Sequence, residues 1–150
     1  MRDAIGSTIM VTIIIAFIVI VSSYLAYNVN YTKAFRMKNK IISIYEDYKG
    51  DCTSQCETEI FNYSRDLGYN PATLNCGSAY VKRPSGNPLY CERRITVNTV
   101  ADDPNQKVVG DKIGTHYYNI VTRINISIPL FDNIFNFGFL YVAGDTKLFY

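Results

Sequence analysis

The most constraining feature of this chain is a long N-terminal stretch without a charged side chain. After Asp3, the next Asp, Glu, Lys or Arg is Lys33, and residues 9–21 between them are almost wholly aliphatic. About 20 apolar residues cross the hydrocarbon core of a bilayer as a helix, and residues 5–27 supply that length. A buried core helix of this kind would need a much larger protein around it than 150 residues provide. The sequence therefore predicts a single-pass membrane protein with the lipid bilayer as one partner.

We expect this segment to be retained rather than cleaved as a signal peptide. Its apolar run exceeds the length of a typical signal-peptide core, and no small-x-small cleavage site follows before Tyr24. Tyr24, Tyr27 and Tyr31 then recur at helical spacing. Tyrosines at such a level are typical of the membrane–water interface, with the ring inward and the hydroxyl toward water.

Two signals for orientation disagree. Basic residues at positions 33, 36, 38 and 40 follow the span, against Arg2 and the α-amine before it, and the positive-inside rule would place the C-terminal part in the cytoplasm. Four cysteines lie in that part, an even number in a small domain, as in oxidising compartments. We favour an extracytoplasmic domain.

The helical pattern continues past the predicted span. Residues 7–49 contain neither Gly nor Pro, and Gly50 is a good stop signal. Apolar residues recur there at steps of three and four, which predicts an amphipathic helix over a small core. They are Ala34, Met37, Ile41, Ile44, Tyr45 and Tyr48. A second, short helix is expected over residues 53–67, capped by Asp51 or Thr53 and ended by Gly68.

Strand patterns fill the C-terminal half. Residues 78–83 and 89–98 read as two strands around the turn at 84–88. Residues 117–129 alternate between apolar and polar side chains, as in a half-buried strand, and the last strand is expected over 137–150 with a bend or bulge at Gly144-Asp145.

The predicted fold class is therefore α+β: a long N-terminal transmembrane and amphipathic helix packed on a small antiparallel sheet of about four strands, with one short extra helix. We expect two regions. Residues 1–29 form a leader and transmembrane helix, and residues 30–150 form an extracytoplasmic domain into which the helix continues to about residue 49.

The cysteines are the strongest local feature. Cys52 and Cys56 lie one helical turn apart, and Cys76 and Cys91 flank the first predicted hairpin. Four cysteines allow three pairings. We favour Cys76–Cys91 because the hairpin brings those ends together. Reduced, buried thiols are the alternative, and a bridge from Cys52 to Cys76 or Cys91 would instead staple the short helix to the sheet.

Little in the sequence points to catalysis or ligand binding. A net charge of +2 lacks the basic footprint of a nucleic-acid binder. The lone histidine, His116, is typical of a surface or packing residue, and Asp102, Asp103, Asn105 and Asp111 match no calcium loop. We expect no enzyme activity, cofactor, metal or small-molecule substrate.

Both ends of the chain resemble a known family. They combine a short polar leader, Met1 to Gly6, with the uninterrupted helix at 7–49 and the tail at 118–130 and 140–146. This arrangement resembles type IV pilin-like subunits, and most closely the TadE-like pseudopilins of tight-adherence pilus systems. The resemblance implies cleavage between Gly6 and Ser7. It also places the family's assembly glutamate at the position of Val11, where this chain departs from the pattern.

Two functions follow as hypotheses. The first is a pilin-like structural subunit of a bacterial surface pilus or secretion filament, which contacts other pilin-like subunits or an assembly platform through its hydrophobic helix. The residues expected at those helix–helix contacts are Val11, Thr12, Ile15, Ile18 and Ser22. The alternative is a membrane-tethered extracellular binding module with no filament role.

Overall fold

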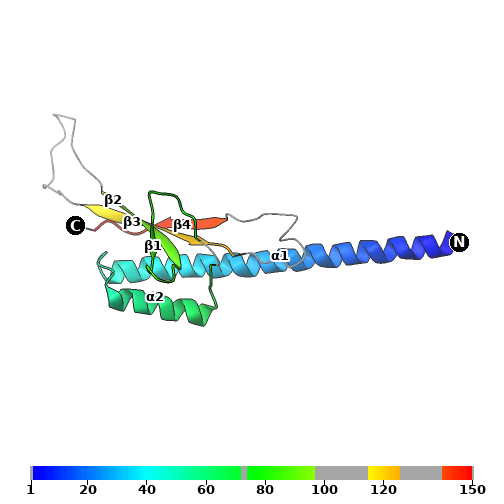
Figure 1. The fold of residues 1–150 in the computed structure, drawn as a ribbon, viewed down its shortest axis with the longest axis horizontal. Helices are drawn as coiled ribbons and strands as arrows, with labels where there is room; N and C mark the ends of the chain where they lie inside the picture. The colour runs from blue at the N-terminus through cyan, green and yellow to red at the C-terminus, as the bar shows by residue number, and fades with distance from the viewer. Residues whose placement is uncertain (1, 72–73, 97–114, 126–139, 150) are drawn as a thin grey trace, which may run out of the picture.

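Helix α1 (Arg2–Asp47) is a single unbroken helix of 46 residues, about 70 Å long, that extends far beyond the rest of the fold (Figure 1). The computed structural model describes residues 2–71, 74–96, 115–125 and 140–149. Within them, a short helix and a four-stranded antiparallel sheet gather at the C-terminal end of α1. The predicted α+β class, with one long helix, one short helix and about four strands, is confirmed.

Helix α1 ends two residues before the predicted limit, in a turn that requires unusual backbone angles. Lys49 and Gly50 have φ values of 53° and 84°, and the Gly50 N–H donates to the Tyr45 carbonyl at 2.8 Å. A Cβ on Gly50 would lie 3.0 Å from the ring of Phe149. Glycine therefore provides both the left-handed conformation and the space that the C-terminal segment occupies.

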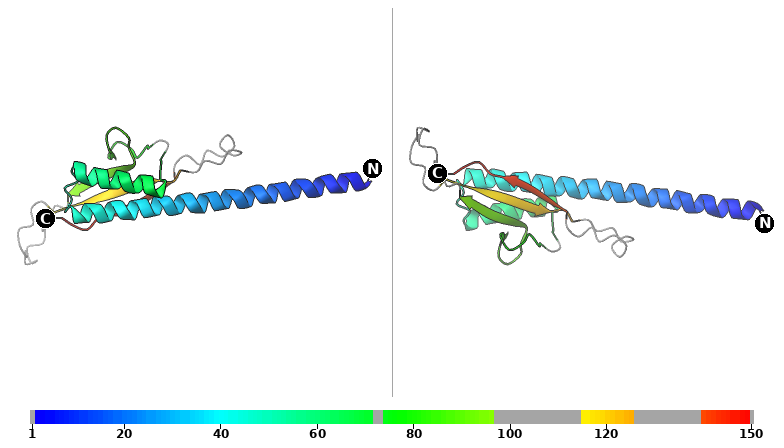
Figure 2. Two further views of the ribbon diagram at one scale, coloured as in Figure 1. Left: turned by 90° about the horizontal axis from the view of Figure 1, so that it is seen from below. Right: turned by 90° about the horizontal axis from the view of Figure 1, so that it is seen from above.

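Helix α2 (Ser54–Leu67) returns beside α1, and both helices lie on one face of the sheet (Figures 1 and 2). Thr53 occupies the N-cap with extended backbone, although its side chain makes no capping hydrogen bond. Gly68 ends the helix in the left-handed conformation, with φ of 63°. The following Tyr69 N–H donates to the Ser64 carbonyl at 2.8 Å, which completes the glycine cap expected from the sequence.

The sheet is a meander in which each strand pairs with the next. Its strands are β1 (Val81–Arg83), β2 (Tyr90–Thr96), β3 (His116–Arg123) and β4 (Tyr141–Asp145), in the order β1-β2-β3-β4. Strand β1 starts three residues later than predicted, and β4 is shorter than predicted. The predicted strand residues 97–98, 126–129 and 137–139 lie outside the described residues.

The prediction of a bend or bulge at Gly144-Asp145 is wrong about its position. Gly144 pairs in regular register with Ile120, and Asp145 pairs with Asn119. A Cβ on Gly144 would lie 2.9 Å from the Ile42 side chain, so this glycine lets β4 pass close over α1. The register shifts by one residue after β4. His116 bridges Phe149, whereas the β3–β4 register would pair it with residue 148.

The main core lies between the two helices and the sheet. The predicted apolar stripe of α1 is confirmed, with Tyr48 half-buried and the other members essentially inaccessible: Ala34, Met37, Ile41, Ile44 and Tyr45. Cys56 and Ile60 of α2 and Ile120 and Ile124 of the β3 region complete this layer. The Thr122 hydroxyl donates to the Ala34 carbonyl at 3.0 Å, where the small alanine lets β3 approach the helix.

The opposite face of the sheet carries a second, smaller cluster that the sequence did not predict. Val121 of β3 lies on the face opposite Ile120 and is only 8 % exposed. It packs with Leu74 and Cys91, and Cys76 and Tyr80 add partly buried contacts. The segment before β1 therefore crosses the outer face of the sheet and covers its centre.

Candidate functional site

The most extended exposed apolar surface among the described residues is the N-terminal part of α1, residues 9–25, which we call the apolar half of α1. Its large apolar side chains are exposed along the whole length, for example Met10 at 69 % and Phe17 at 66 %. Within the described residues, this helix alone is long and apolar enough to cross a membrane, with a mean hydropathy of 2.7 in its most apolar stretch. None of that stretch is buried in the protein, so it is not a core helix.

The residues expected to contact neighbouring helices lie on this surface. Val11, Ile15 and Ile18 are 53 %, 56 % and 57 % exposed and follow one another at steps of four and three. Ser22 continues the same stripe, and Thr12 lies beside it. All five side chains are therefore exposed and accessible to an external partner.

Polar side chains along the first two thirds of α1 bond back to the helix itself. The Thr12 hydroxyl donates to the Thr8 carbonyl at 2.9 Å, and the Ser23 hydroxyl donates to the Val19 carbonyl at 2.8 Å. Asn28, Asn30 and Thr32 make the same bond to the carbonyl four residues earlier, at 2.8–3.0 Å. The hydroxyl donors are thereby satisfied without water, as an apolar environment requires, while each asparagine amide keeps one further N–H.

The predicted processing site lies within the first turns of α1. Gly6 and Ser7 are both helical, and a Cβ on Gly6 would meet nothing within 4 Å. This glycine is therefore not required by packing inside the subunit. Cleavage between Gly6 and Ser7 stays a prediction.

Aromatic side chains mark the transition between the exposed and the packed parts of α1. Tyr24 is 65 % exposed, and the ring of Tyr27 stacks on that of Tyr31 with centroids 6.1 Å apart. Tyr31 in turn stacks on Phe35 at 6.2 Å, and the Lys38 Nζ lies 4.5 Å from the Phe35 centroid. Two of the predicted interfacial tyrosines, Tyr27 and Tyr31, thus form a row with Phe35 that overlaps the first turn of the core.

The basic group, the four Lys and Arg side chains at positions 33, 36, 38 and 40, has two members that contact α2. The Lys33 Nζ donates to the carbonyl of Gly68, just past the C-terminus of α2, at 3.2 Å. A cation there complements the negative end of the helix dipole. The Lys40 Nζ lies 3.1 Å from Glu59 of α2. Lys33 and Lys40 therefore connect α1 to α2.

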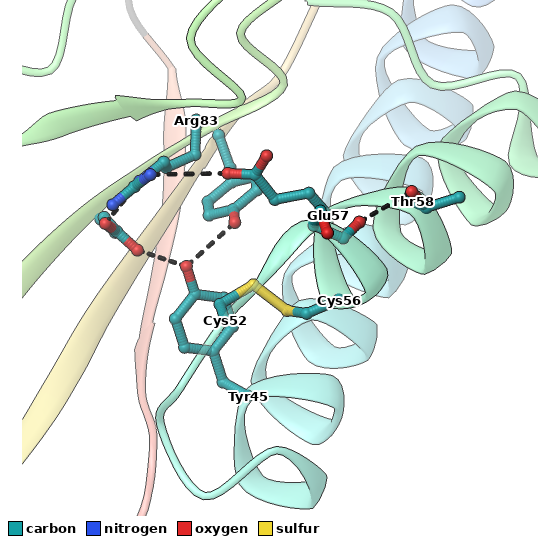
Figure 3. Close-up of a disulfide and its surroundings, with 9 residues drawn as sticks. Tyr45, Cys52, Cys56, Glu57, Thr58 and Arg83 are labelled. Carbon is teal, nitrogen blue, oxygen red and sulfur yellow. Dashed lines mark hydrogen bonds and ion pairs between the residues drawn. A yellow bond between two sulfur atoms is a disulfide. The ribbon is translucent and has the colours of Figure 1, made fainter.

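The four cysteines form two disulfides. Cys76 is bonded to Cys91 near the start of β2, which is the pairing favoured from the sequence. However, Cys76 lies before β1, and the bridge ties the outer segment to the sheet rather than closing the hairpin. Cys52 is bonded to Cys56, joining the α1–α2 turn to the first turn of α2 (Figure 3).

A polar network that the sequence did not predict lies beside the Cys52–Cys56 disulfide. Glu92 of β2 is only 7 % exposed, and it accepts hydrogen bonds from the Tyr45 hydroxyl and from Arg83 Nε, the latter at 2.7 Å. The Tyr45 and Tyr90 hydroxyls are 3.0 Å apart. Arg83 also lies 3.5 Å from Glu57 of α2, so the network joins α1, β1, β2 and α2 (Figure 3).

Burial and hydrogen bonding in this network raise the pKa values of its tyrosine and arginine members. The hydrogen bond to Glu92 raises the pKa of the Arg83 guanidinium, and burial raises the pKa of the Tyr90 hydroxyl. The groups donate to and accept from one another, which suits a structural link between helices and sheet. A carboxylate in a strand next to two arginines gave no sequence signal for this role, because its partners come from other elements.

Other candidates for chemistry are limited. Within residues 2–71, 74–96, 115–125 and 140–149, no three His, Cys, Asp or Glu side chains are placed to hold a metal. His116 packs against Tyr118 and Phe149, with ring centroids 5.6 and 5.8 Å away, as expected of a packing residue. The acidic loop at 102–111 lies outside the described residues. No family of known proteins, curated protein or solved structure matches the chain.

Proposed function

We propose that this chain is a membrane-anchored, pilin-like structural subunit, similar to TadE-like pseudopilins, that assembles through the apolar half of α1 into a bacterial surface pilus, a secretion filament or its assembly platform. The observation that carries the proposal is that one helix both builds the domain core and exposes a predominantly apolar rod without a charged side chain. Large side chains on every side of that rod need lipid or neighbouring helices to cover them.

The continuity of α1 favours assembly over simple tethering. A tether needs only about 20 apolar residues and tolerates a loop between anchor and domain. Here the helix runs without interruption from Arg2 to Asp47, and the apolar stripe of its C-terminal part is buried in the chain's own core. The apolar half presents side chains in a fixed relation to the domain, as a subunit that packs in a defined geometry requires.

An extracytoplasmic position for the domain is part of the proposal. Two disulfides tie together a small domain, which is typical of oxidising compartments. The basic group that argues for the opposite orientation has a structural use, because Lys33 and Lys40 bond to α2. A membrane-impermeant thiol reagent, applied to intact cells after mild reduction, should label the cysteines. Labelling seen only after lysis would reverse the orientation.

Cross-linking through single added cysteines tests assembly. Positions 9–21 would be replaced one at a time in the full chain, with the native disulfides kept oxidised. We expect disulfide-linked dimers to recur at steps of three and four, strongest near Ile15 and Ile18. Ser85, in the exposed β1–β2 turn, serves as the control position and should not cross-link. A monomeric pattern throughout, at native expression, would favour the tethered binding module instead.

A matched pair of substitutions separates assembly from folding. Val11 and Val81 are similarly exposed, at 53 % and 56 %, but lie on the apolar half and on β1. Val11→Lys should abolish incorporation into assemblies, and Val81→Lys should leave it unchanged, while both chains keep their disulfides. Equal incorporation of the two variants would argue against the apolar half as the assembly surface.

A further inference from the structure

A shallow groove opens beside α1 at the end of the domain nearest the apolar half. It has a volume of about 350 Å³ and is lined by Asn28, Val29, Thr32, Lys33, Arg36 and Leu67. Its walls come from α1 and from the C-terminal end of α2. Among the described residues, two cationic side chains and no acidic one line it.

The strongest donors that remain for a ligand in this groove are cationic, since Asn28 keeps only one neutral amide N–H. The Asn28 amide and the Thr32 hydroxyl donate to the helix's own carbonyls at 2.9 and 2.8 Å. The Lys33 ammonium has one bond to the Gly68 carbonyl and two further protons, and the exposed Arg36 guanidinium has a planar fork of donors. The chemistry of the groove therefore selects an anion, and the fork suits a phosphate.

The groove also changes along the helix axis from an apolar end to a cationic end. Val29 is 55 % exposed and lies at the end toward the apolar half, with Leu67 across from α1 as a second apolar wall. Arg36 lies seven residues further on, about 10 Å along the axis. An apolar end followed by a cationic end matches a phospholipid, whose acyl chains lead through glycerol to phosphate. Free phosphate would make no use of the apolar end.

The level of the groove fits the same ligand. With the tyrosine at position 27 at the edge of the hydrocarbon, residues 28–36 rise from about 2 to 14 Å above it. The headgroup layer on each side of a bilayer is about 5–8 Å thick, so Asn28 to Lys33 lie within or just above it and the Arg36 side chain can reach down to phosphate.

We propose that this groove binds the headgroup of an anionic phospholipid from the leaflet at the domain's base, with Lys33 and Arg36 on the phosphate and with Val29 and Leu67 against the glycerol and first acyl carbons. The proposal rests on the membrane anchoring proposed above. It gives the two basic residues nearest the bilayer a second role, in fixing the height and rotation of the subunit at the membrane surface.

The test uses the full chain in micelles of a neutral detergent, titrated with dihexanoyl phosphatidylglycerol and followed by NMR. We expect saturable shifts at residues 28–36 and 67, weakened about tenfold by Arg36→Gln, since one charge-assisted hydrogen bond is lost. Lys40→Gln removes the same charge one turn outside the groove and should change the affinity by less than twofold. Inorganic phosphate should give no saturable shift.

Three outcomes would overturn the proposal: no saturation by the lipid, equal weakening by the two variants, or equal binding of inorganic phosphate, which would indicate a free-anion site. Alkaline carbonate extraction of membranes tests the anchor separately. Release of the chain by carbonate would refute the proposed function. Retention without lipid saturation would refute only the headgroup site.

Discussion

The hydroxyl of Tyr69 bonds to both backbone groups of Arg123: it donates to the carbonyl and accepts from the N–H, each at 3.0 Å. Tyr69 follows the glycine that ends α2, and Arg123 is the last residue of β3. One side chain thus joins the end of the second helix to the end of a central strand. The Tyr141 hydroxyl makes the same pair of bonds to Asn75, at 2.8 and 3.2 Å, at an exposed site.

Removing the Tyr69 hydroxyl should destabilise the fold. Tyr69→Phe removes both of these partly buried hydrogen bonds, and we expect the free energy of unfolding to fall by about 1–3 kcal/mol. Tyr141→Phe should cost less than about 1 kcal/mol because water can replace the lost bonds. Urea denaturation of the full chain in mild detergent, followed by near-ultraviolet circular dichroism, compares the two. Equal losses would contradict this account.

Stability should fall in alkaline solution. Burial raises the pKa of Tyr69 and Tyr90 above the ordinary value of 10.0. Above about pH 10 the unfolded chain loses phenolic protons that the folded chain retains. The free energy of unfolding is therefore unaffected by these groups below pH 10 and decreases above it, by about 1.4 kcal/mol per pH unit for each such tyrosine. Tyr90→Phe should reduce that slope by one tyrosine's share between pH 10 and 12, and an unchanged slope would show that burial does not control it.

Gly144 should tolerate no larger residue. A Cβ there would lie 2.9 Å from the end of the Ile42 side chain and 3.0 Å from the Lys38 side chain, so Gly144→Val must displace these side chains or move β4 away from α1. We expect a loss of about 1–3 kcal/mol, as for other overpacked sites. Gly86, in the exposed β1–β2 turn, has open space at its Cβ position, and Gly86→Val is the control. Comparable thermal stabilities for the two variants would contradict the close approach.

The two disulfides should contribute unequally. Their partners are separated by 4 and 15 residues in the sequence. On the chain-entropy model, the Cys52–Cys56 bridge stabilises by about 2 kcal/mol and the Cys76–Cys91 bridge by about 3 kcal/mol. Paired replacements by serine, compared by urea denaturation, should therefore leave the variant without Cys76–Cys91 the less stable. The reverse order would mean that the outer segment holds its place without the bridge.

The domain should fold without the apolar half. Ala34 is the first residue of α1 in the main core, so a fragment of residues 30–150 keeps every buried contact described for that helix. We expect it to be soluble, with both native disulfides on peptide mapping and the near-ultraviolet spectrum of the full chain. Aggregation, or scrambled pairing, would show that residues before position 30 take part in folding.

Features set by local sequence were predicted well. The absence of Gly and Pro from residues 7–49, the stop at Gly50 and the cap at Gly68 act within one or two turns, and the structure has each of them. The stripe from Ala34 to Tyr45 was predictable because a helix with one apolar face must bury it.

Features that depend on distant segments were missed. Alternation in β3 predicted one buried face, and nothing in residues 74–80 indicated that they would cover the other at Val121. The buried role of Glu92 was also not predictable, because its partners Tyr45 and Arg83 are brought to it by the packing of α1 and β1. The exposure of the apolar half was predictable because the rest of the chain is too small to cover it, but its partner is not encoded in one chain.

Because α1 has no joint between its apolar half and its core half, the direction of the domain is set by whatever holds the apolar half. Tyr27 and Asp47 are separated by 20 residues of one helix, about 30 Å of its axis. A tilt of about 20°, ordinary for a membrane-spanning helix, would carry the far end of the domain sideways by about 10 Å. A rotation of the helix about its own axis would turn the sheet by the same angle. Neighbouring subunits that shift the helix by a few degrees would thereby reorient the exposed face of the domain without any change in its internal structure.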